Sequence, residues 1–325
     1  MPGLHRHATR IAAGVRGSRC ERGGTISYLG IDVGGTKVAL RVEGSGQKTY
    51  ETSFRWNSAR NSRSQGAADL AMLADEVSEL RRYWREPIQA VGVAMPARLD
   101  GSGRVLAWPG RPGWVGVELG TSLRTLFPDT EVRCADDGEL AALAEAREVG
   151  CTDLFYLGVG TGIGGGIVSG GRSLRGRTSR SCEIGHVVVD RGGTGCDCGR
   201  RGCLQAVASG PATLRRAAEL RGADVTFTEL RHAVLAGRPW AVSAVADSAA
   251  ALAAAVISVD ELLHPALVLI GGGFAAQLPG LVETVSAEVV RLARPGSPPP
   301  PVQPAALGGL SSLRGAVLAA RGLAG

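Results

Sequence analysis

Three cysteines and one histidine have the spacing of a metal site. His186 is followed by Cys196, Cys198 and Cys203, so three thiols lie within eight residues. Three thiolates and one imidazole make a complete tetrahedral zinc set with no position left open for water. We therefore predict a structural zinc site, although a histidine alone is more often a surface or core residue. Loss of the metal should loosen the loop that carries Glu183.

A carboxylate precedes a glycine turn near the start of the sequence. Asp32 ends an apolar stretch, and the residues that follow include Gly34, Gly35, Thr36 and Lys37. Glycines let backbone N–H groups approach a polyanion, and a nearby aspartate can hold Mg²⁺ or its water shell. Taken alone, such a turn is more often an ordinary glycine hairpin.

Two further glycine clusters follow apolar strand candidates. They are the run 158–166, with Gly160, Thr161 and Gly162 at its centre, and the cluster Gly271, Gly272 and Gly273. The run at 158–166 leads into strand-forming residues and does not open a helix, so the dinucleotide-binding fingerprint is disfavoured. A hairpin that cradles phosphate fits this pattern better.

Two adjacent aspartates lie at a predicted junction between a strand and a helix. Asp136 and Asp137 separate the strand candidate 131–135 from the helix candidate 138–148. Phosphoryl transfer from ATP to a hydroxyl needs a carboxylate that takes the proton of the attacking oxygen, and a helix N-terminus keeps an aspartate ionised. Either residue could instead be a simple helix cap. Because there are two, one can cap the helix while the other acts as the base.

Hydrophobic patterns predict an α/β protein with an internal repeat. Strand candidates lie at 28–33, 38–42, 88–95, 131–135, 154–159 and 266–270, and helix candidates at 66–84, 138–148, 211–223, 239–264 and 311–321. The strand, turn and strand that begin at 154 repeat the arrangement that begins at 28, which indicates a duplicated domain.

Composition indicates a folded protein and places most of the excess charge before the first strand. The chain has 325 residues, 44% of them hydrophobic, and a net charge of +6. Five arginines and one glutamate precede residue 27, so the remainder is nearly balanced and we expect no nucleic-acid partner. No uninterrupted apolar stretch approaches the roughly 20 residues of a membrane span, and the leader lacks a secretory apolar region. We expect a cytoplasmic protein without membrane contact.

Together these motifs resemble the ROK family (repressors, open reading frames and kinases), which includes the bacterial glucokinases. The resemblance runs from Tyr28 to the C-terminus and adds Glu-x-Gly-His at 183–186 to the glycine turns and the cysteine cluster. It implies a two-lobed, duplicated fold of the actin/hexokinase type, which is similar to ribonuclease H, and a homo-oligomer. We expect a disordered leader at 1–26, a small lobe at 27–137 plus 312–325, and a large lobe with the zinc loop at 138–311.

The same resemblance implies ATP- and Mg²⁺-dependent phosphorylation of the primary hydroxyl of a glucose-like ring. Asp137 would be the base, and Glu183 and His186 would contact ring hydroxyls. Two positions depart from the glucokinase pattern, because Asp136 replaces an asparagine and Gln205 replaces a glutamate. An anion in place of an amide favours a nearby cation. We therefore expect an altered acceptor, either an amino sugar such as kanosamine or a C7 cyclitol, and glucose itself stays open as an acceptor.

A further departure and two other function classes bear on this interpretation. A Pro-Asn pair of the family is Pro109-Gly110 in this sequence.

Transcriptional repressors of the family carry a DNA-binding module ahead of the first turn, and only about 30 residues precede Asp32, too few for a three-helix reader. A sugar-sensing regulator without catalysis is the alternative outside enzymes. A polyphosphate-dependent kinase would need a basic groove, for which the balanced charge gives little support.

Overall fold

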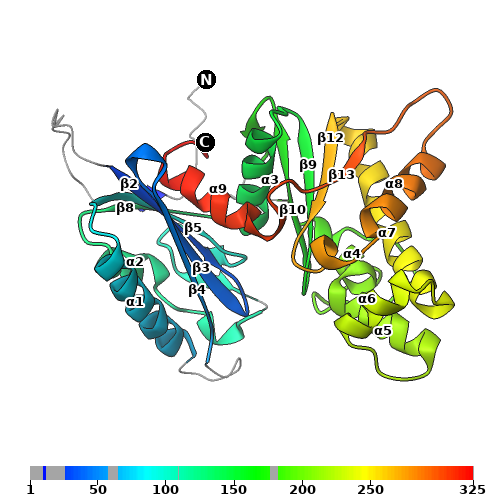
Figure 1. The fold of residues 1–325 in the computed structure, drawn as a ribbon, viewed down its shortest axis with the longest axis horizontal. Helices are drawn as coiled ribbons and strands as arrows, with labels where there is room; N and C mark the ends of the chain where they lie inside the picture. Colours follow the sequence, from blue (N-terminus) through cyan, green and yellow to red (C-terminus); the bar gives the residue numbers. More distant parts are fainter. Residues whose placement is uncertain (1–9, 12–25, 58–64, 109, 176–181, 325) are drawn as a thin grey trace. The chain divides into compact units, whose positions relative to one another are not determined.

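The computed structural model describes residues 10–11, 26–57, 65–108, 110–175 and 182–324, and these form two compact units. Unit 1 is Met1–Leu140 with Arg175–Arg180 and Ser312–Gly325, and unit 2 is Ala141–Leu174 with Ser181–Ser311. Each unit has its own sheet, its own helices and its own hydrophobic core (Figure 1). The chain is therefore an α/β protein built around two cores.

Unit 1 contains a six-stranded sheet in the order β1-β8-β5-β2-β3-β4. Its strands are β1 (Arg10–Ile11), β2 (Ser27–Val33), β3 (Lys37–Glu43), β4 (Thr49–Arg55), β5 (Ile88–Ala94) and β8 (Glu131–Ala135). β2, β5 and β8 run parallel, whereas β2, β3 and β4 form antiparallel pairs. A two-stranded sheet joins β6 (Arg98–Leu99) to β7 (Val105–Ala107).

Helices cover the sheet of unit 1 (Figure 1). They are α1 (Gln65–Tyr83), α2 (Leu119–Leu126) and α9 (Ser311–Ala320). α1 directs Leu73, Val77 and Leu80 into the core, as its helical period predicts. α9 lies against two strand glycines, Gly30 and Gly92. A Cβ on Gly92 would lie 1.8 Å from the carbonyl oxygen of Ala316. Without side chains at these strand positions, the helix backbone can pack directly on the sheet.

Unit 2 contains a five-stranded sheet in the order β11-β10-β9-β12-β13. Its strands are β9 (Leu154–Val159), β10 (Ile163–Ser169), β11 (Arg172–Ser173), β12 (Leu267–Gly271) and β13 (Val302–Pro304). Its helices are α4 (Leu204–Ala208), α5 (Gly210–Arg221), α6 (Phe227–Leu235), α7 (Pro239–Leu263) and α8 (Leu281–Leu292), and α3 (Asp137–Glu148) passes from unit 1 into unit 2. The β9–β10 hairpin repeats the β2–β3 hairpin, as predicted.

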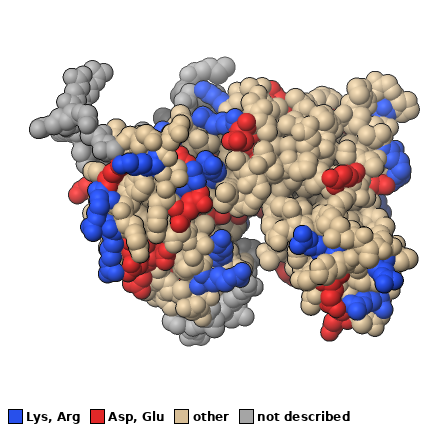
Figure 2. Space-filling model, in the orientation of Figure 1, with Lys and Arg blue, Asp and Glu red and all other residues tan. Residues whose placement is uncertain are grey.

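By length and composition alone, α7 is long and apolar enough to cross a membrane. Most of its buried residues are alanines and valines in the core of unit 2, where the helix packs against α4, α5 and α8, whereas Val242 is exposed. The apolar character of the helix is therefore explained largely by its buried face, which belongs to this core. On the face drawn in Figure 2, Lys and Arg side chains lie among Asp and Glu side chains in both units.

Several predicted elements are confirmed, and others need correction. The strands at 131–135 and 154–159 have the predicted bounds, but several elements were missed, among them β4, α2, α6 and β13. Within the leader expected to be disordered, Arg10 and Ile11 pair with β8, whose outer edge offers unpaired backbone groups. The remaining residues of 1–25 lie outside the described residues.

Candidate active site

The β2–β3 turn holds the first predicted phosphate loop. The N–H of Gly34 donates to the carbonyl oxygen of Lys37 at 3.0 Å, so the hairpin is confirmed. Thr36 and Lys37 are exposed, while Asp32 lies at the end of β2. Burial raises the pKa of Asp32 to about 6, and the charge of Lys37 partly opposes this rise. A cation beside Asp32 would favour its charged form.

The two adjacent aspartates make different contacts at the start of α3. Oδ1 of Asp136 accepts the N–H groups of Gly138 at 3.0 Å and Glu139 at 3.1 Å, so Asp136 caps α3. Asp137 is the first residue of α3, and its Oδ1 accepts the N–H of Gly138 at 2.8 Å. Asp136 therefore serves as the helix cap, and Asp137 is not needed for that role.

Three carboxylates of unit 1 act on one another. Burial raises the pKa of Asp137 well above its usual range, and the charges of Asp136 and Asp32 raise it further. A raised pKa makes the ionised carboxylate a better proton acceptor. Hard oxygen donors gathered in this way fit a divalent cation such as Mg²⁺, and their charge equally suits an ammonium group.

The second and third glycine clusters meet within unit 2. The β9–β10 turn closes with a hydrogen bond from the N–H of Gly160 to the carbonyl oxygen of Gly162, at 2.9 Å. The loop after β12 packs beside it, because the N–H of Phe274 donates to the oxygen of Val159 at 3.0 Å. Gly272 has φ +88°, and a Cβ there would lie 2.5 Å from the backbone of Val159. Only glycine fits this position.

The predicted turn at 158–166 is shorter than expected. Residues 163–166 belong to β10 and pair with β9, so the turn itself is Gly160–Gly162. Small residues continue into the strand because other groups pack closely against it. A Cβ on Gly165 would lie 2.4 Å from the carbonyl oxygen of Tyr156. Thr161 is exposed at the tip of the turn.

The histidine and cysteines predicted to bind zinc come together in unit 2. Ligand atoms of His186, Cys196, Cys198 and Cys203 all lie within 4.8 Å of one another. The Sγ atoms of Cys198 and Cys203 are 3.6 Å apart, and Sγ of Cys196 is 3.8 Å from Nδ1 of His186. Sulfur ligands of a tetrahedral zinc are about 3.8 Å apart, given Zn–S bonds near 2.3 Å. Both the donor set and the spacing therefore fit zinc.

The predicted acceptor residues of unit 2 are connected to this cluster. A short 3₁₀ turn, Ile184–His186, carries His186 and begins beside the exposed Glu183. Gln205 lies in α4, with Nε2 3.7 Å from Sγ of Cys196. Its Oε1 also lies 3.4 Å from where a Cβ on Gly162 would be. Gln205 thus lies beside both the group of His186 and its three cysteines and the β9–β10 turn.

Comparison with known proteins identifies the family. The ROK family model matches residues 28–322. The chain belongs to the ROK family. A kanosamine kinase of Amycolatopsis mediterranei (strain S699) is 58% identical over 294 residues, which cover 90% of this chain and 96% of that protein. This ROK protein is accordingly an ATP-dependent sugar kinase.

Solved structures of the family have the same fold. The ROK hexokinase of Thermus thermophilus has a TM-score of 0.78 and 32% identity, and the match covers 91% of this chain and 98% of that chain. A ROK glucokinase of Streptomyces griseus in complex with glucose and AMPPNP has a TM-score of 0.78 and 25% identity, covering 91% and 99%. The actin/hexokinase-like fold predicted from the glycine turns is therefore confirmed.

A group of side chains around the first turn was missed in the sequence. Trp56 and Arg111 donate hydrogen bonds to the turn, and Asp69 holds Arg111. Asp69 carried a detectable signal, since it lies one helical turn before Leu73 on the buried face of α1. A carboxylate on an apolar helix face requires a buried partner.

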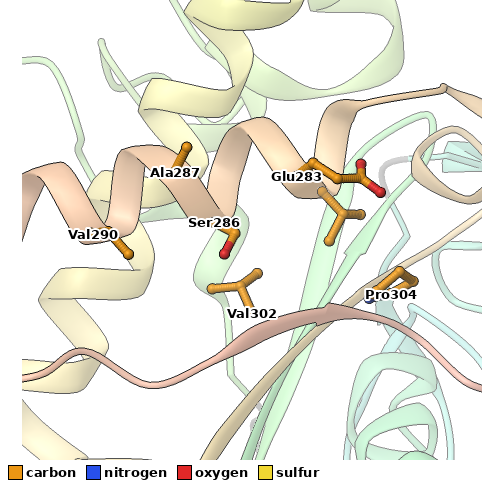
Figure 3. A pocket seen from close by; sticks show the side chains of 7 residues that line it. Glu283, Ser286, Ala287, Val290, Val302 and Pro304 are labelled. Carbon is orange, nitrogen blue, oxygen red and sulfur yellow. The ribbon is translucent and has the colours of Figure 1, made fainter.

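A surface hollow of about 540 Å³ between α8 and β13 contains none of the predicted site residues. Valines and an alanine form most of its wall, and Glu283 and Ser286 are its polar groups (Figure 3). One carboxylate and one hydroxyl do not make a phosphoryl-transfer site, so we assign no chemistry to this hollow.

Proposed function

We propose that this ROK kinase transfers the γ-phosphoryl group of ATP to the primary hydroxyl of an amino sugar of the kanosamine type. The observation that carries the proposal is Asp136, a carboxylate at the position where glucokinases have an asparagine. The 58% identity to a kanosamine kinase supports the same acceptor.

In the proposed reaction, Asp137 is the general base. Its carboxylate accepts the proton of the sugar hydroxyl while that oxygen attacks the γ-phosphorus, and ADP leaves. The raised pKa of Asp137 favours this proton transfer. Bound Mg²⁺ would neutralise charge on the phosphates, and Asp32 is the residue proposed to hold it or its water shell.

Backbone groups are proposed to bind the nucleotide. The turn at Gly34, Gly35, Thr36 and Lys37 and the turn at Gly160–Gly162 would donate N–H groups to phosphate oxygens. The loop Gly271–Gly273, which packs beside the second turn, would border the adenosine.

Unit 2 is proposed to supply further contacts to the acceptor. Glu183 and His186 would bind ring hydroxyls, and Gln205 would lie beside them. We propose that zinc, held by His186 and the three clustered cysteines, fixes this loop without taking part in the chemistry. A closed four-ligand set has no position left for a reacting water.

Asp136 is proposed to select the ammonium group of the acceptor. Three carboxylates that interact in unit 1 create a negative field, which an ammonium relieves and a hydroxyl does not. A hydrogen bond to a charged group contributes about 1.5–3 kcal/mol, compared with about 1 kcal/mol for a neutral one. The difference corresponds to a preference of about tenfold.

The test compares kcat/KM for kanosamine, glucose and a valiolone-type cyclitol in the wild-type enzyme and in Asp136→Asn. Asparagine caps a helix about as well as aspartate, so this variant changes the charge and keeps the cap. We expect the wild type to prefer kanosamine over glucose by about tenfold or more, and the variant to lose that preference. Asp75→Asn, an exposed change on α1, is the charge control.

One outcome would contradict the proposed acceptor, and another would contradict the proposed role of Asp136. A wild-type preference for glucose or for the cyclitol would exclude the amino sugar as the acceptor. If Asp136→Asn kept the preference for kanosamine, the acceptor would stand, but the ion pair would not explain it.

A further inference from the structure

Three consecutive carbonyl groups of the β2–β3 turn accept hydrogen bonds from two residues elsewhere in unit 1, two from side chains and one from a backbone N–H. The oxygen of Gly34 accepts the indole N–H of Trp56 at 2.8 Å, and the oxygen of Gly35 accepts Nη1–H of Arg111 at 3.0 Å. The backbone N–H of Trp56 donates to the oxygen of Thr36 at 3.2 Å. We call this set of contacts the carbonyl clamp.

Arg111 is itself fixed by buried partners. Its Nε and Nη2 donate to the two oxygens of Asp69 at 2.7 and 2.9 Å, and the indole of Trp114 donates to Asp69 at 2.6 Å. The guanidinium carbon lies 4.9 Å from the ring centroid of Trp56, so the two clamp residues also contact each other. The side chain of Arg111 is 1% exposed and that of Asp69 is fully buried.

The buried ion pair of Arg111 and Asp69 is not explained by a contribution to stability alone. Well-packed apolar side chains in place of a buried ion pair are often neutral or stabilising, because two charges must otherwise leave water. The pair does, however, define the position of a planar donor fork. The fork also donates to the oxygen of Gly35, in the turn proposed to bind phosphate.

We propose that Trp56 and Arg111 are positioning residues, which orient the N–H groups of the β2–β3 turn toward the phosphates of ATP. The inference rests on the proposed role of this turn in nucleotide binding. A trans peptide is planar, so the N–H of one residue points away from the carbonyl of the residue before it. Holding the oxygens of Gly34 and Gly35 therefore aims the N–H groups of Gly35 and Thr36 away from the clamp.

Glycine makes this restraint necessary. Gly34 and Gly35 have no Cβ to limit their backbone angles, so a turn built from them would sample many orientations. An unclamped turn would have to be ordered when ATP binds, which weakens the affinity. The carbonyl clamp orders the turn before the nucleotide binds. Loss of the clamp should therefore weaken the affinity for ATP and leave the affinity for the sugar unchanged.

The first test removes one donor of the clamp and keeps its shape. Trp56→Phe loses the indole N–H to Gly34, retains the ring beside Arg111 and retains the backbone N–H to Thr36. Trp84→Phe is the matched control, because Trp84 is also half-buried in unit 1 and its indole donates to Oγ of Ser27 at 2.9 Å, away from the turn.

Calorimetry with Mg²⁺ and AMPPNP, without acceptor, measures the effect on the nucleotide directly. We expect Kd for AMPPNP to rise about tenfold in Trp56→Phe and to stay within twofold of the wild type in Trp84→Phe. In steady state, KM for ATP should rise while KM for the sugar is unchanged. Arg111→Lys, which keeps the charge but loses the fork, should raise Kd for AMPPNP as well.

The outcomes separate the clamp from the proposed function. If Trp56→Phe lowers Tm as Trp84→Phe does but leaves Kd for AMPPNP unchanged, the contacts are only structural and the inference is overturned. If the wild type does not bind AMPPNP, the proposed nucleotide site itself is wrong. If AMPPNP binds but kanosamine is not phosphorylated, the acceptor is wrong and the clamp can still be tested by binding.

Discussion

Asp137 combines a helix N-terminal position with a carboxyl group whose pKa is raised by burial and by two neighbouring carboxylates. Replacement by asparagine keeps an oxygen that can accept the N–H of Gly138 and removes the base. We expect Asp137→Asn to lower kcat by roughly 10²–10⁴-fold with a small change in the KM of the sugar, measured as ADP formation. Asp75→Asn is the control. A variant that retained a tenth of the wild-type kcat would contradict the role of Asp137 as base.

The two aspartates also show what single positions in a sequence can predict. A helix cap and a general base can both be a carboxylate at this junction, so the sequence is enough to single out the two aspartates. Only the hydrogen bonds of the structure show that Asp136 is the cap. Trp56 and Arg111 could not be found in this way. They lie 55 residues apart and meet only when the sheet and the following segment fold together. Local sequence patterns carry no information about tertiary contacts between residues so far apart in the chain.

At the scale of elements, one buried carboxylate anchors the segment that leads into α9. Glu145 of α3 is fully buried, and its oxygens accept the N–H groups of Ala306 at 2.8 Å and Leu307 at 3.1 Å and the hydroxyl of Ser311 at 2.6 Å. A carboxylate can accept all three hydrogen bonds, whereas an amide turns an NH₂ group toward at least one donor. The helix and the segment are therefore joined by this one side chain.

We expect Glu145→Gln to lower the free energy of unfolding by about 2–4 kcal/mol, because a buried donor would lose its charged partner. Chemical denaturation followed by circular dichroism measures this change. Glu148→Gln, an exposed change in the last turn of the same helix, should be within about 0.5 kcal/mol of the wild type. Equal effects of the two substitutions would show that Glu145 does not anchor the segment.

Two of the elements missed in the sequence, β4 and β13, have weak local signals for physical reasons. β4 is an edge strand whose side chains alternate between exposed and half-buried, so it lacks an apolar run. β13 ends on Pro304 inside a proline-rich segment, and proline is tolerated there because β13 is at the sheet edge. α6 did have a signal, the capping box of Thr226 and Glu229.

At the scale of the whole molecule, two separate cores predict that the proposed zinc acts on one unit. Ile184, Leu204 and Ala208 flank the group of His186 and its three cysteines and belong to the core of unit 2. The core of unit 1 is formed by other residues, from β2, β3, β5 and α1 among others. Metal binding contributes to folding where its ligands lie. Its loss should therefore loosen unit 2 around the cluster first.

Hydrogen exchange with and without a chelator measures this directly. We expect faster amide exchange in 184–208 after chelation, unchanged exchange in β2 and β5, and lower kcat/KM for the sugar. Cys151→Ser, outside the cluster, should respond to the chelator as the wild type does, and Cys198→Ser should show the fast exchange before any chelator is added. Faster exchange spread equally over both cores would mean that the units unfold as one. An unchanged pattern in 184–208 would mean that the cluster holds no structural metal.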